Sequence, residues 1–206
     1  MQEIAVQHAV RTLRARGIDF ASVKCIDVGG SRNVFLVRAE PIHRSPSTLL
    51  ARLRRFRSRQ TTVPLCEVTR NPLLDVFAHV TLLDHGFTGE LLNTDTDLKG
   101  DFLDDAFIAG LRHSYGVVLS FDTLEHVEDP FRFCRHLVDI AQDGGHIYLQ
   151  TVFSWEYHPS PQDYFRYSPE GLRRCFRGAP AAVLASGWIV EGVSTFVLLQ
   201  KVAPCA

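Results

Sequence analysis

The stretch VVLSFDTLEHVEDPFRFCRHL, from Val117 to Leu137, decides the fold of this chain. It begins as a nearly continuous apolar run, typical of a strand buried on both faces of a parallel sheet. Acidic residues and a histidine follow at once. Pro130 then stands in the first-turn position that proline favours, and apolar residues recur on one helical face beyond it. The stretch therefore predicts a buried strand, a turn rich in carboxylates and a helix.

Strand and helix patterns alternate on both sides of this stretch. The predicted helices cover about residues 5–13, 104–114, 129–145 and 168–178, and the predicted strands cover 23–30, 78–86, 89–95, 115–122 and 146–153. Two strands without a helix between them close the chain between residues 181 and 203. This order predicts an α/β fold with a mostly parallel sheet and an antiparallel terminal hairpin.

The segment from Val34 to about Asp75 interrupts the alternation with several prolines and many arginines. We predict an irregular insertion at about 38–75 that carries a short basic helix at Ser47–Arg59. The arginines of this helix either meet an anionic substrate or form a solvated basic face. They are Arg52, Arg54, Arg55, Arg57 and Arg59.

Length and composition favour one globular domain, 1–206, in a cytoplasmic protein. The chain has 206 residues and a net charge of -1, so we expect no nucleic-acid partner. Its five cysteines are odd in number and form no CxxC pair, which suggests neither a disulfide framework nor a zinc site. The N-terminal residues do not resemble a signal peptide, and no apolar run approaches the length of a membrane span.

Acidic residues stand at the carboxyl ends of four successive predicted strands, where an open parallel sheet binds its ligands. Glycines there let a ligand approach the backbone, a carboxylate can hold a ribose diol, and an acid beside an aromatic ring can read adenine. The pattern predicts adenosyl recognition without a pyrophosphate, although each aspartate could instead cap the following helix. The residues are Asp27, Gly29, Gly30, Asp84, Asp101, Phe102, Asp122, Thr123 and Leu124.

These segments resemble the class I S-adenosylmethionine-dependent methyltransferases, specifically the small-molecule branch whose fourth strand ends in D-x-L-E-H-V-x-D-P. The likeness is specific from Tyr115 to about Phe176, and weaker but in the same order in IDVGGSRN, TLLDHG and GDF. It implies a Rossmann-like fold with a seven-stranded, mostly parallel sheet and helices on both faces. It also implies S-adenosylmethionine as cofactor, S-adenosylhomocysteine as product and a small-molecule acceptor.

The resemblance also implies a role for each strand-end residue. Asp27, Gly29 and Gly30, with Ser31 beside them, would line the methionine portion of the cofactor; Asp84 would hold the ribose hydroxyls; Asp101 and Phe102 would meet the adenine; and Asp122, Thr123 and Leu124 would pass under the sulfonium. In this family, extra segments tend to cover the active site or mediate dimers. The 38–75 insertion is therefore expected to form a lid or a homodimer interface.

The first loop departs from the family pattern, because Ser31 and Asn33 stand where later glycines are usual. This departure motivates an alternative, a degenerate member that acts as a binding or scaffold subunit. A nicotinamide-dependent dehydrogenase is disfavoured, since the first turn lacks the G-x-G-x-x-G spacing that suits a pyrophosphate.

Methyl transfer to a hydroxyl requires a base near neutral pH, and histidine is the first choice. His158, Asp163 and Tyr164 follow the fifth predicted strand on the side expected to bind the acceptor, and His126 is a further candidate that could instead be structural. We predict transfer to oxygen of a secondary-metabolite or sugar-like molecule, with transfer to nitrogen or carbon as the alternative. No set of residues with metal-ligand spacing is evident, so no metal is predicted.

Overall fold

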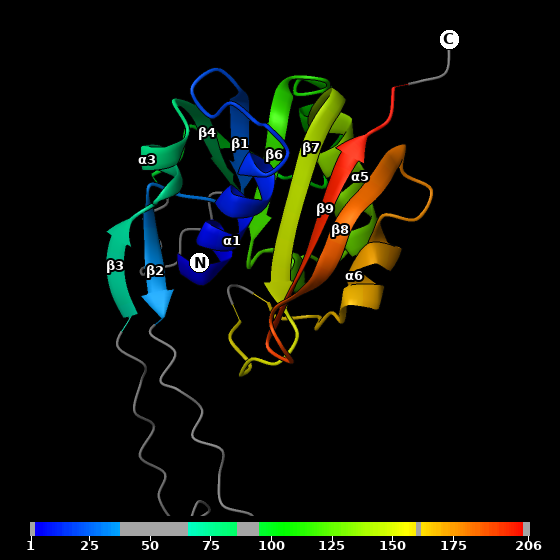
Figure 1. Cartoon of the computed structure of the whole chain (residues 1–206). Coiled ribbons are helices and arrows are strands. Elements are labelled where there is room, and N and C mark those ends of the chain that lie inside the picture. Colours follow the sequence, from blue (N-terminus) through cyan, green and yellow to red (C-terminus); the bar gives the residue numbers. More distant parts are fainter. Residues whose placement is uncertain (1–2, 38–65, 86–94, 160–161, 204–206) are drawn as a thin grey trace, which may run out of the picture.

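The computed structural model describes residues 3–37, 66–85, 95–159 and 162–203. Its main element is a seven-stranded sheet in the order β5-β4-β1-β6-β7-β9-β8 (Figure 1). The strands are β1 (Lys24–Val28), β4 (His79–Asp84), β5 (Leu98–Lys99), β6 (Tyr115–Phe121), β7 (Ala141–Val152), β8 (Ala181–Val190) and β9 (Ser194–Lys201). Neighbours from β5 to β7 pair in parallel, whereas β9 pairs antiparallel with both β7 and β8. The predicted fold class is confirmed.

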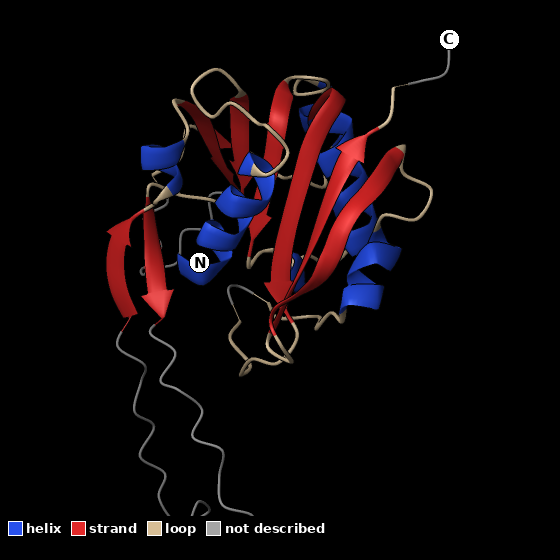
Figure 2. Cartoon of the chain, viewed as in Figure 1, coloured by secondary structure: helices blue, strands red, loops and turns tan. Residues whose placement is uncertain are grey.

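Helices cover both faces of the sheet (Figure 2). On one face α1 (Glu3–Arg14) buries an apolar stripe against alternate residues of β6, including Val117 and Leu119. On the other face α5 (Pro130–Ile140) packs with α4 (Asp105–Ala109) and α6 (Pro169–Cys175) around Val118. Because successive strand residues point to opposite faces, the continuous apolar run of β6 supplies both cores. Within the described ranges, no helix has the length and apolar character needed to cross a membrane.

The sequence signals for helix starts are confirmed. The Asp129 side chain accepts a hydrogen bond from the Arg132 N–H and caps α5, whose first residue is Pro130. Ser168 caps α6 in the same way, by accepting from the Gly171 N–H. The predicted end of α5 near residue 145 was wrong, because the helix ends at Ile140 and β7 begins at once.

The connection from β1 to β4 differs from the predicted irregular segment. It contains an antiparallel pair, β2 (Asn33–Val37) and β3 (Cys66–Arg70), followed by the short helix α3 (Leu73–Val76). Residues 38–65, including the predicted basic helix at 47–59, lie outside the described residues, so its role as a lid or interface stays a prediction. Leu98–Lys99 forms the strand beside β4, and the predicted strand at 89–95 stays a prediction, because residues 89–94 are not described.

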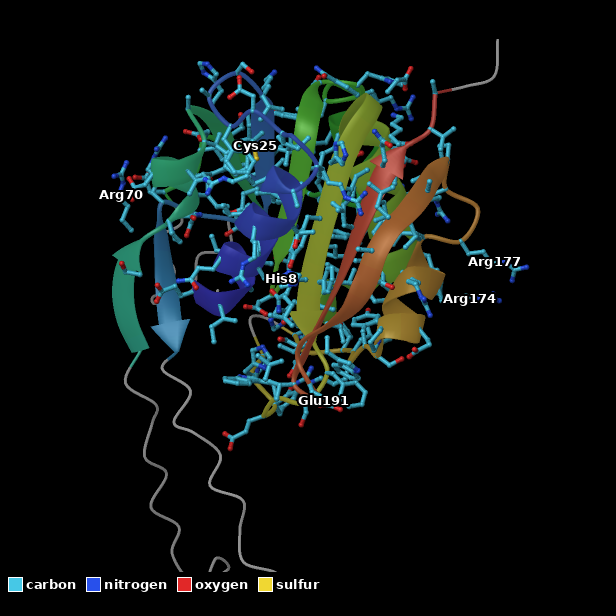
Figure 3. All side chains as sticks on the ribbon, viewed as in Figure 1. His8, Cys25, Arg70, Arg174, Arg177 and Glu191 are labelled. Carbon is cyan, nitrogen blue, oxygen red and sulfur yellow. The ribbon has the colours of Figure 1, made fainter. Side chains whose placement is uncertain are left out.

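The distribution of side chains follows from these layers. Cys25 of β1 is buried inside the sheet, while Arg70, Arg174 and Arg177 project at its periphery (Figure 3). The parallel strands end at one common edge, and the loop that follows β7 lies there (Figure 1). Ligand-binding residues of an open parallel sheet belong at this edge.

Candidate functional site

The first loop, which follows β1, has no space for side chains at its two glycines. Gly29 has a φ of +84°, and a Cβ there would overlap the side chain of Thr123, which follows β6. A Cβ at Gly30 would overlap the carboxylate of Asp27. At Gly29 the two loops therefore approach each other more closely than any residue but glycine permits.

Asp27 offers a buried carboxylate beneath this loop. The Asn71 side chain donates to Oδ2 of Asp27 at 3.2 Å and to the Ser31 carbonyl at 3.0 Å. The other oxygen, Oδ1, has no hydrogen-bond partner among the described residues. Burial raises the pKa of Asp27 to about 7. An orphaned buried carboxylate oxygen fits a cationic ligand group, such as the amino group of a methionine moiety.

Asn71 was missed by the sequence reasoning. It is fully buried, and its Oδ1 accepts from the Leu73 N–H at 3.0 Å while its side-chain amide holds the first loop. The nearby prolines led us to expect irregular structure in this region, and no local pattern indicates that the chain returns to Asp27 here. Asn71 therefore links the base of the β2–β3 hairpin to the first loop.

The remaining predicted cofactor residues stand at the end of β4 and after β5. In the sheet these two strands lie on the opposite side of β1 from β6. Asp84 ends β4, is partly buried and accepts from the His85 N–H at 2.7 Å, and burial raises its pKa. Asp101 accepts from the Leu103 N–H at 2.8 Å. The Phe102 ring is buried 4.9 Å from the Phe133 ring, so most of its surface packs into the core. The roles of these residues at ribose and adenine stay predictions.

The turn after β6 is held in an unusual conformation. Asp122 has a φ of +45°, in the left-handed region that non-glycine residues seldom occupy. Its carboxylate accepts from the Gln150 side chain of β7 at 2.8 Å, and Thr123 Oγ1 donates to the Phe121 carbonyl at 2.8 Å. Leu124 is fully buried. This turn faces the first loop through Thr123, so Asp122, Thr123 and the first-loop residues form one rim.

Glu125 follows this turn and belongs to a second group of polar residues. The sequence analysis named some members of this group as catalytic candidates but not Glu125. Its Oε2 accepts from Thr151 Oγ1 at 2.8 Å, whereas its Oε1 has no hydrogen-bond partner in the described part of the chain. Burial, reinforced by the charge of Asp122, raises the pKa of Glu125 to about 8. The sequence signal for Glu125 was its place in the acidic stretch after β6. We assigned roles to its neighbours in that stretch and none to Glu125.

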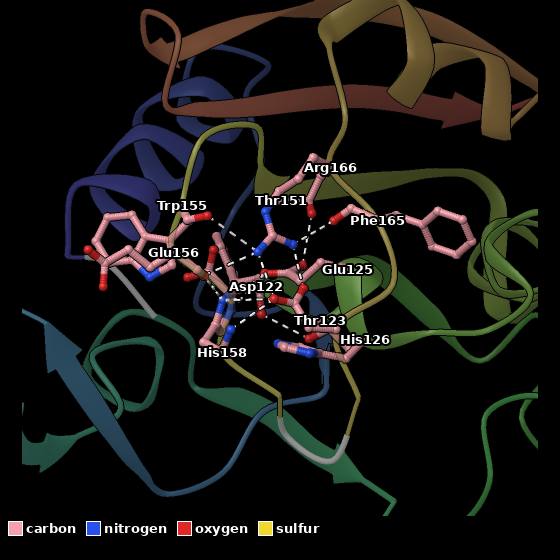
Figure 4. Close-up of polar contacts among 12 residues, drawn as sticks. Asp122, Thr123, Glu125, His126, Thr151, Trp155, Glu156, His158, Phe165 and Arg166 are labelled. Carbon is pink, nitrogen blue, oxygen red and sulfur yellow. Dashed lines mark hydrogen bonds and ion pairs between the residues drawn. The ribbon is translucent and has the colours of Figure 1, made fainter.

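His158, from the loop after β7, meets this buried glutamate (Figure 4). Its Nε2 lies 3.9 Å from Oε1 of Glu125, its Nδ1 lies 2.8 Å from the Glu156 carbonyl, and its backbone N–H donates to Asp163 at 2.9 Å. The His126 ring stands at right angles to the His158 ring, with centroids 4.9 Å apart. The fold thus brings together His126, His158 and Asp163 with Glu125, and the catalytic roles of the first three stay predictions.

An ion pair fixes the loop around His158. Arg166 contacts both carboxylate oxygens of Asp163, and its guanidinium also donates to the Glu156 carbonyl at 3.2 Å. The hydrogen-bonded Arg166 holds the pKa of Asp163 well below its usual range. Tyr164 joins the cluster through its backbone N–H, which donates to the Glu125 carbonyl at 2.8 Å, while its side chain is 47% exposed.

The sequence matches a family model described as a methyltransferase domain over residues 5–185. The chain belongs to this methyltransferase family. Membership confirms the predicted class of enzyme and its cofactor, S-adenosylmethionine. The D-x-L-E-H-V-x-D-P branch and the role of each site residue are not part of that finding. A search of curated proteins finds no match.

Solved methyltransferase structures share the fold at low sequence identity. A chain of the Haloferax volcanii complex between the Trm112 activator and a methyltransferase is 17% identical, with a TM-score of 0.57 over 98% of this chain and 90% of that one. Magnesium protoporphyrin IX methyltransferase from Synechocystis PCC 6803 with bound S-adenosylhomocysteine is 14% identical (TM-score 0.53, 95% and 81% covered). The 1,6-didemethyltoxoflavin-N1-methyltransferase of Burkholderia thailandensis is 12% identical (TM-score 0.55, 97% and 79% covered).

Proposed function

We propose that this methyltransferase transfers a methyl group from S-adenosylmethionine to a hydroxyl oxygen of a small molecule. The observation that carries the proposal is the position of His158, whose Nε2 lies 3.9 Å from Oε1 of Glu125, two residues after Thr123. A histidine that can accept a proton is needed when the acceptor is a neutral hydroxyl, and much less for an amine.

The first loop supports the cofactor assignment. The cofactor supplies an electrophilic methyl group, and it leaves as S-adenosylhomocysteine when the new carbon–oxygen bond forms. Asp27 would hold the amino group through its unpartnered Oδ1, and Gly29 and Gly30 would admit the methionine portion against the backbone. Asp84, which ends β4, would hold the ribose hydroxyls. Ser31 contributes its carbonyl to the Asn71 amide, so the altered glycine pattern leaves the loop ordered.

The contacts of His158 support its role as the base. Its Nδ1 faces the Glu156 carbonyl, which can only accept, so the neutral ring carries its proton there and leaves the lone pair on Nε2. The Asp163 carboxylate, held by Arg166, fixes the backbone of His158 by accepting its N–H. Nε2 is then the atom that receives the proton of the hydroxyl group.

The alternative functions differ either in the atom that is methylated or in whether the protein is an enzyme. Transfer to nitrogen or carbon stays the alternative within enzymes, and solved relatives of this fold include an N1-methyltransferase by name. A degenerate scaffold subunit is the alternative outside enzymes, motivated by Ser31 and Asn33. The buried carboxylate of Asp27 disfavours it, because a subunit without cofactor has no need for a buried oxygen that lacks a partner among the described residues.

The test is transfer of an isotope-labelled methyl group to a panel of phenols, sugars, amines and carbon nucleophiles. We expect methyl ethers as products and a His158→Gln variant that loses about 10²–10⁴ in turnover while its affinity for S-adenosylhomocysteine stays within about twofold. His79→Gln, an exposed position at the start of β4, is the matched control. Products methylated at nitrogen or carbon, or a fully active His158→Gln variant, would contradict the proposal.

A further inference from the structure

Three potential ligands from two loops converge on one space beside the acceptor side (Figure 4). They are a carboxylate oxygen of Glu125 and one ring nitrogen each of His126 and His158, and these atoms all lie within 4.8 Å of one another. The sequence predicted no metal site, since His158 is far along the chain from the other two. The fold removes that separation, because β6 and β7 are neighbours and their loops leave the same edge.

Both histidine rings are oriented by backbone carbonyls. Nδ1 of His126 contacts the Gln162 carbonyl, and Nδ1 of His158 contacts the Glu156 carbonyl. A carbonyl accepts and cannot donate, so each neutral ring keeps its proton on Nδ1 and carries its lone pair on Nε2. This arrangement, with the second ring nitrogen donating to a carbonyl, is the usual one for histidines that bind metals.

The carboxylate oxygen that faces the histidines is also without a donor. Oε1 of Glu125 is completely buried and has no hydrogen-bond partner in the described ranges, while Oε2 is already satisfied by Thr151. Arg166, whose charge acts on Glu125, is already hydrogen-bonded to Asp163. Among the described residues, no hydrogen-bond donor satisfies Oε1 of Glu125, and an unsatisfied buried acceptor of this kind needs a cation or a proton.

We propose that Glu125, His126 and His158 form a binding site for a divalent transition-metal ion such as Zn²⁺, Mn²⁺ or Co²⁺. Two imidazoles and one carboxylate are a ligand set that these ions favour, and three protein ligands leave coordination positions open for a small molecule. The charge of Asp122 lies close enough to act on both Glu125 and His126, and it adds to the attraction for a cation.

The geometry requires a modest contraction. Metal–ligand bonds to nitrogen and oxygen are about 2.0–2.2 Å long, so ligand atoms around one ion stand about 3–3.5 Å apart. The 3.9 Å between Glu125 Oε1 and His158 Nε2 is close to that range. Small rotations of the histidine side chains, which are only partly buried, would bring all three atoms into it.

The use of such an ion in catalysis, unlike the site itself, rests on the proposed function. An ion bound to three protein ligands would coordinate the acceptor hydroxyl and lower its pKa, so that bulk water rather than His158 could take the proton. His158 would act as the base in the metal-free chain and as a ligand in the metal-loaded chain, because one lone pair on Nε2 cannot bind a metal and take a proton at the same time. Metal binding and methyl transfer are therefore measured separately.

The test is titration of the metal-free, tag-free full chain with Co²⁺, Zn²⁺ and Mn²⁺, followed by calorimetry and, for Co²⁺, by visible absorption. We expect one equivalent of at least one ion to bind with micromolar or tighter affinity, with a spectrum of nitrogen and oxygen ligands rather than thiolates. Glu125→Gln, His126→Gln and His158→Gln should each weaken binding at least tenfold, and His79→Gln should not. Glu125→Gln keeps the size of the side chain and an acceptor for Thr151, and thermal melting checks that each variant folds.

Two outcomes overturn the proposal: no saturable binding of any of the three ions, or binding that Glu125→Gln leaves unchanged. Neither outcome bears on methyl transfer, which would then depend on His158 as the base. Conversely, a chain that binds the ion but methylates no acceptor would refute the proposed function and leave the metal site standing.

Discussion

Replacing Asp27 with asparagine tests the electrostatics of the first loop. Burial raises the pKa of Asp27 from 3.8 to about 7, so the folded protein retains a proton there that the unfolded chain has already released. Between about pH 4 and pH 7 the unfolded state binds fewer protons than the folded state, so the free energy of unfolding falls as the pH rises. Asparagine does not titrate and can still accept from Asn71, so Asp27→Asn removes this fall.

The size of the effect follows from the two pKa values. Between pH 5 and pH 8 the linkage relation gives a loss of about 2–3 kcal/mol from Asp27 alone. Urea unfolding of the native chain and Asp27→Asn at both pH values measures it. The difference between the two proteins isolates Asp27 from Glu125, whose raised pKa affects both equally.

The same replacement separates stability from binding. S-adenosylhomocysteine carries a cationic amino group that favours the ionised carboxylate of Asp27, so its affinity for the native chain should rise from pH 6 to pH 8 and should be weak and pH-independent in Asp27→Asn. If the pH dependence of stability differs by less than about 0.5 kcal/mol between the two proteins, the carboxylate is not buried in solution as described and this reasoning fails.

Three further replacements probe neighbouring contacts. Gly29→Ala places a Cβ against Thr123 at a positive φ, so it should lower the unfolding free energy by about 1–3 kcal/mol in urea titrations; an unchanged value would mean that the loops separate easily. Asn71→Ala removes the donor to the first loop and should reduce S-adenosylhomocysteine affinity by about tenfold in calorimetry, a loss of one hydrogen bond to a charged group; equal affinity would contradict the linking role. Arg166→Ala leaves the Asp163 carboxylate with the His158 N–H but without its cationic partner, and should lower the unfolding free energy by about 1–3 kcal/mol, measured by thermal unfolding; a loss well below about 1 kcal/mol would show that Asp163 is hydrated.

Much of the fold could be predicted from the sequence because its signals are local. The apolar run of Val117–Phe121, the Asp129 cap and Pro130 each act within a few residues of their own position, and each is confirmed. The end of α5 was misjudged because glycine is a common helix stop, yet Gly144 has a positive φ of 75° within β7 instead. The β2–β3 pair was missed because prolines and arginines in the surrounding segment outweighed its short apolar runs.

The candidate site likewise contains residues that local sequence signals identify and residues that depend on contacts between distant parts of the chain. Residues that directly follow a strand, such as Asp27 and Asp122, are placed at the sheet edge by the strand itself, so the strand order is enough to find them. Glu125 and Asn71 act through partners far along the chain, namely His158 and the first loop, and no spacing rule indicates such pairs. Their importance becomes visible only as buried polar atoms, one satisfied and one not.

The altered first loop shows why such distant contacts matter. In this chain β2 begins at Asn33, directly after the loop, so the connection from β1 to β4 starts as a strand. No helix therefore begins directly after this loop. The backbone N–H groups of a helix start, which can bind an anion, are not available there. The loop is held instead by Asn71, whose amide bonds the Ser31 carbonyl and whose N–H donates to the Arg32 carbonyl at 2.7 Å. Serine and asparagine are tolerated at the later glycine positions because an extended chain leaves the loop there, and extended backbone needs no glycine.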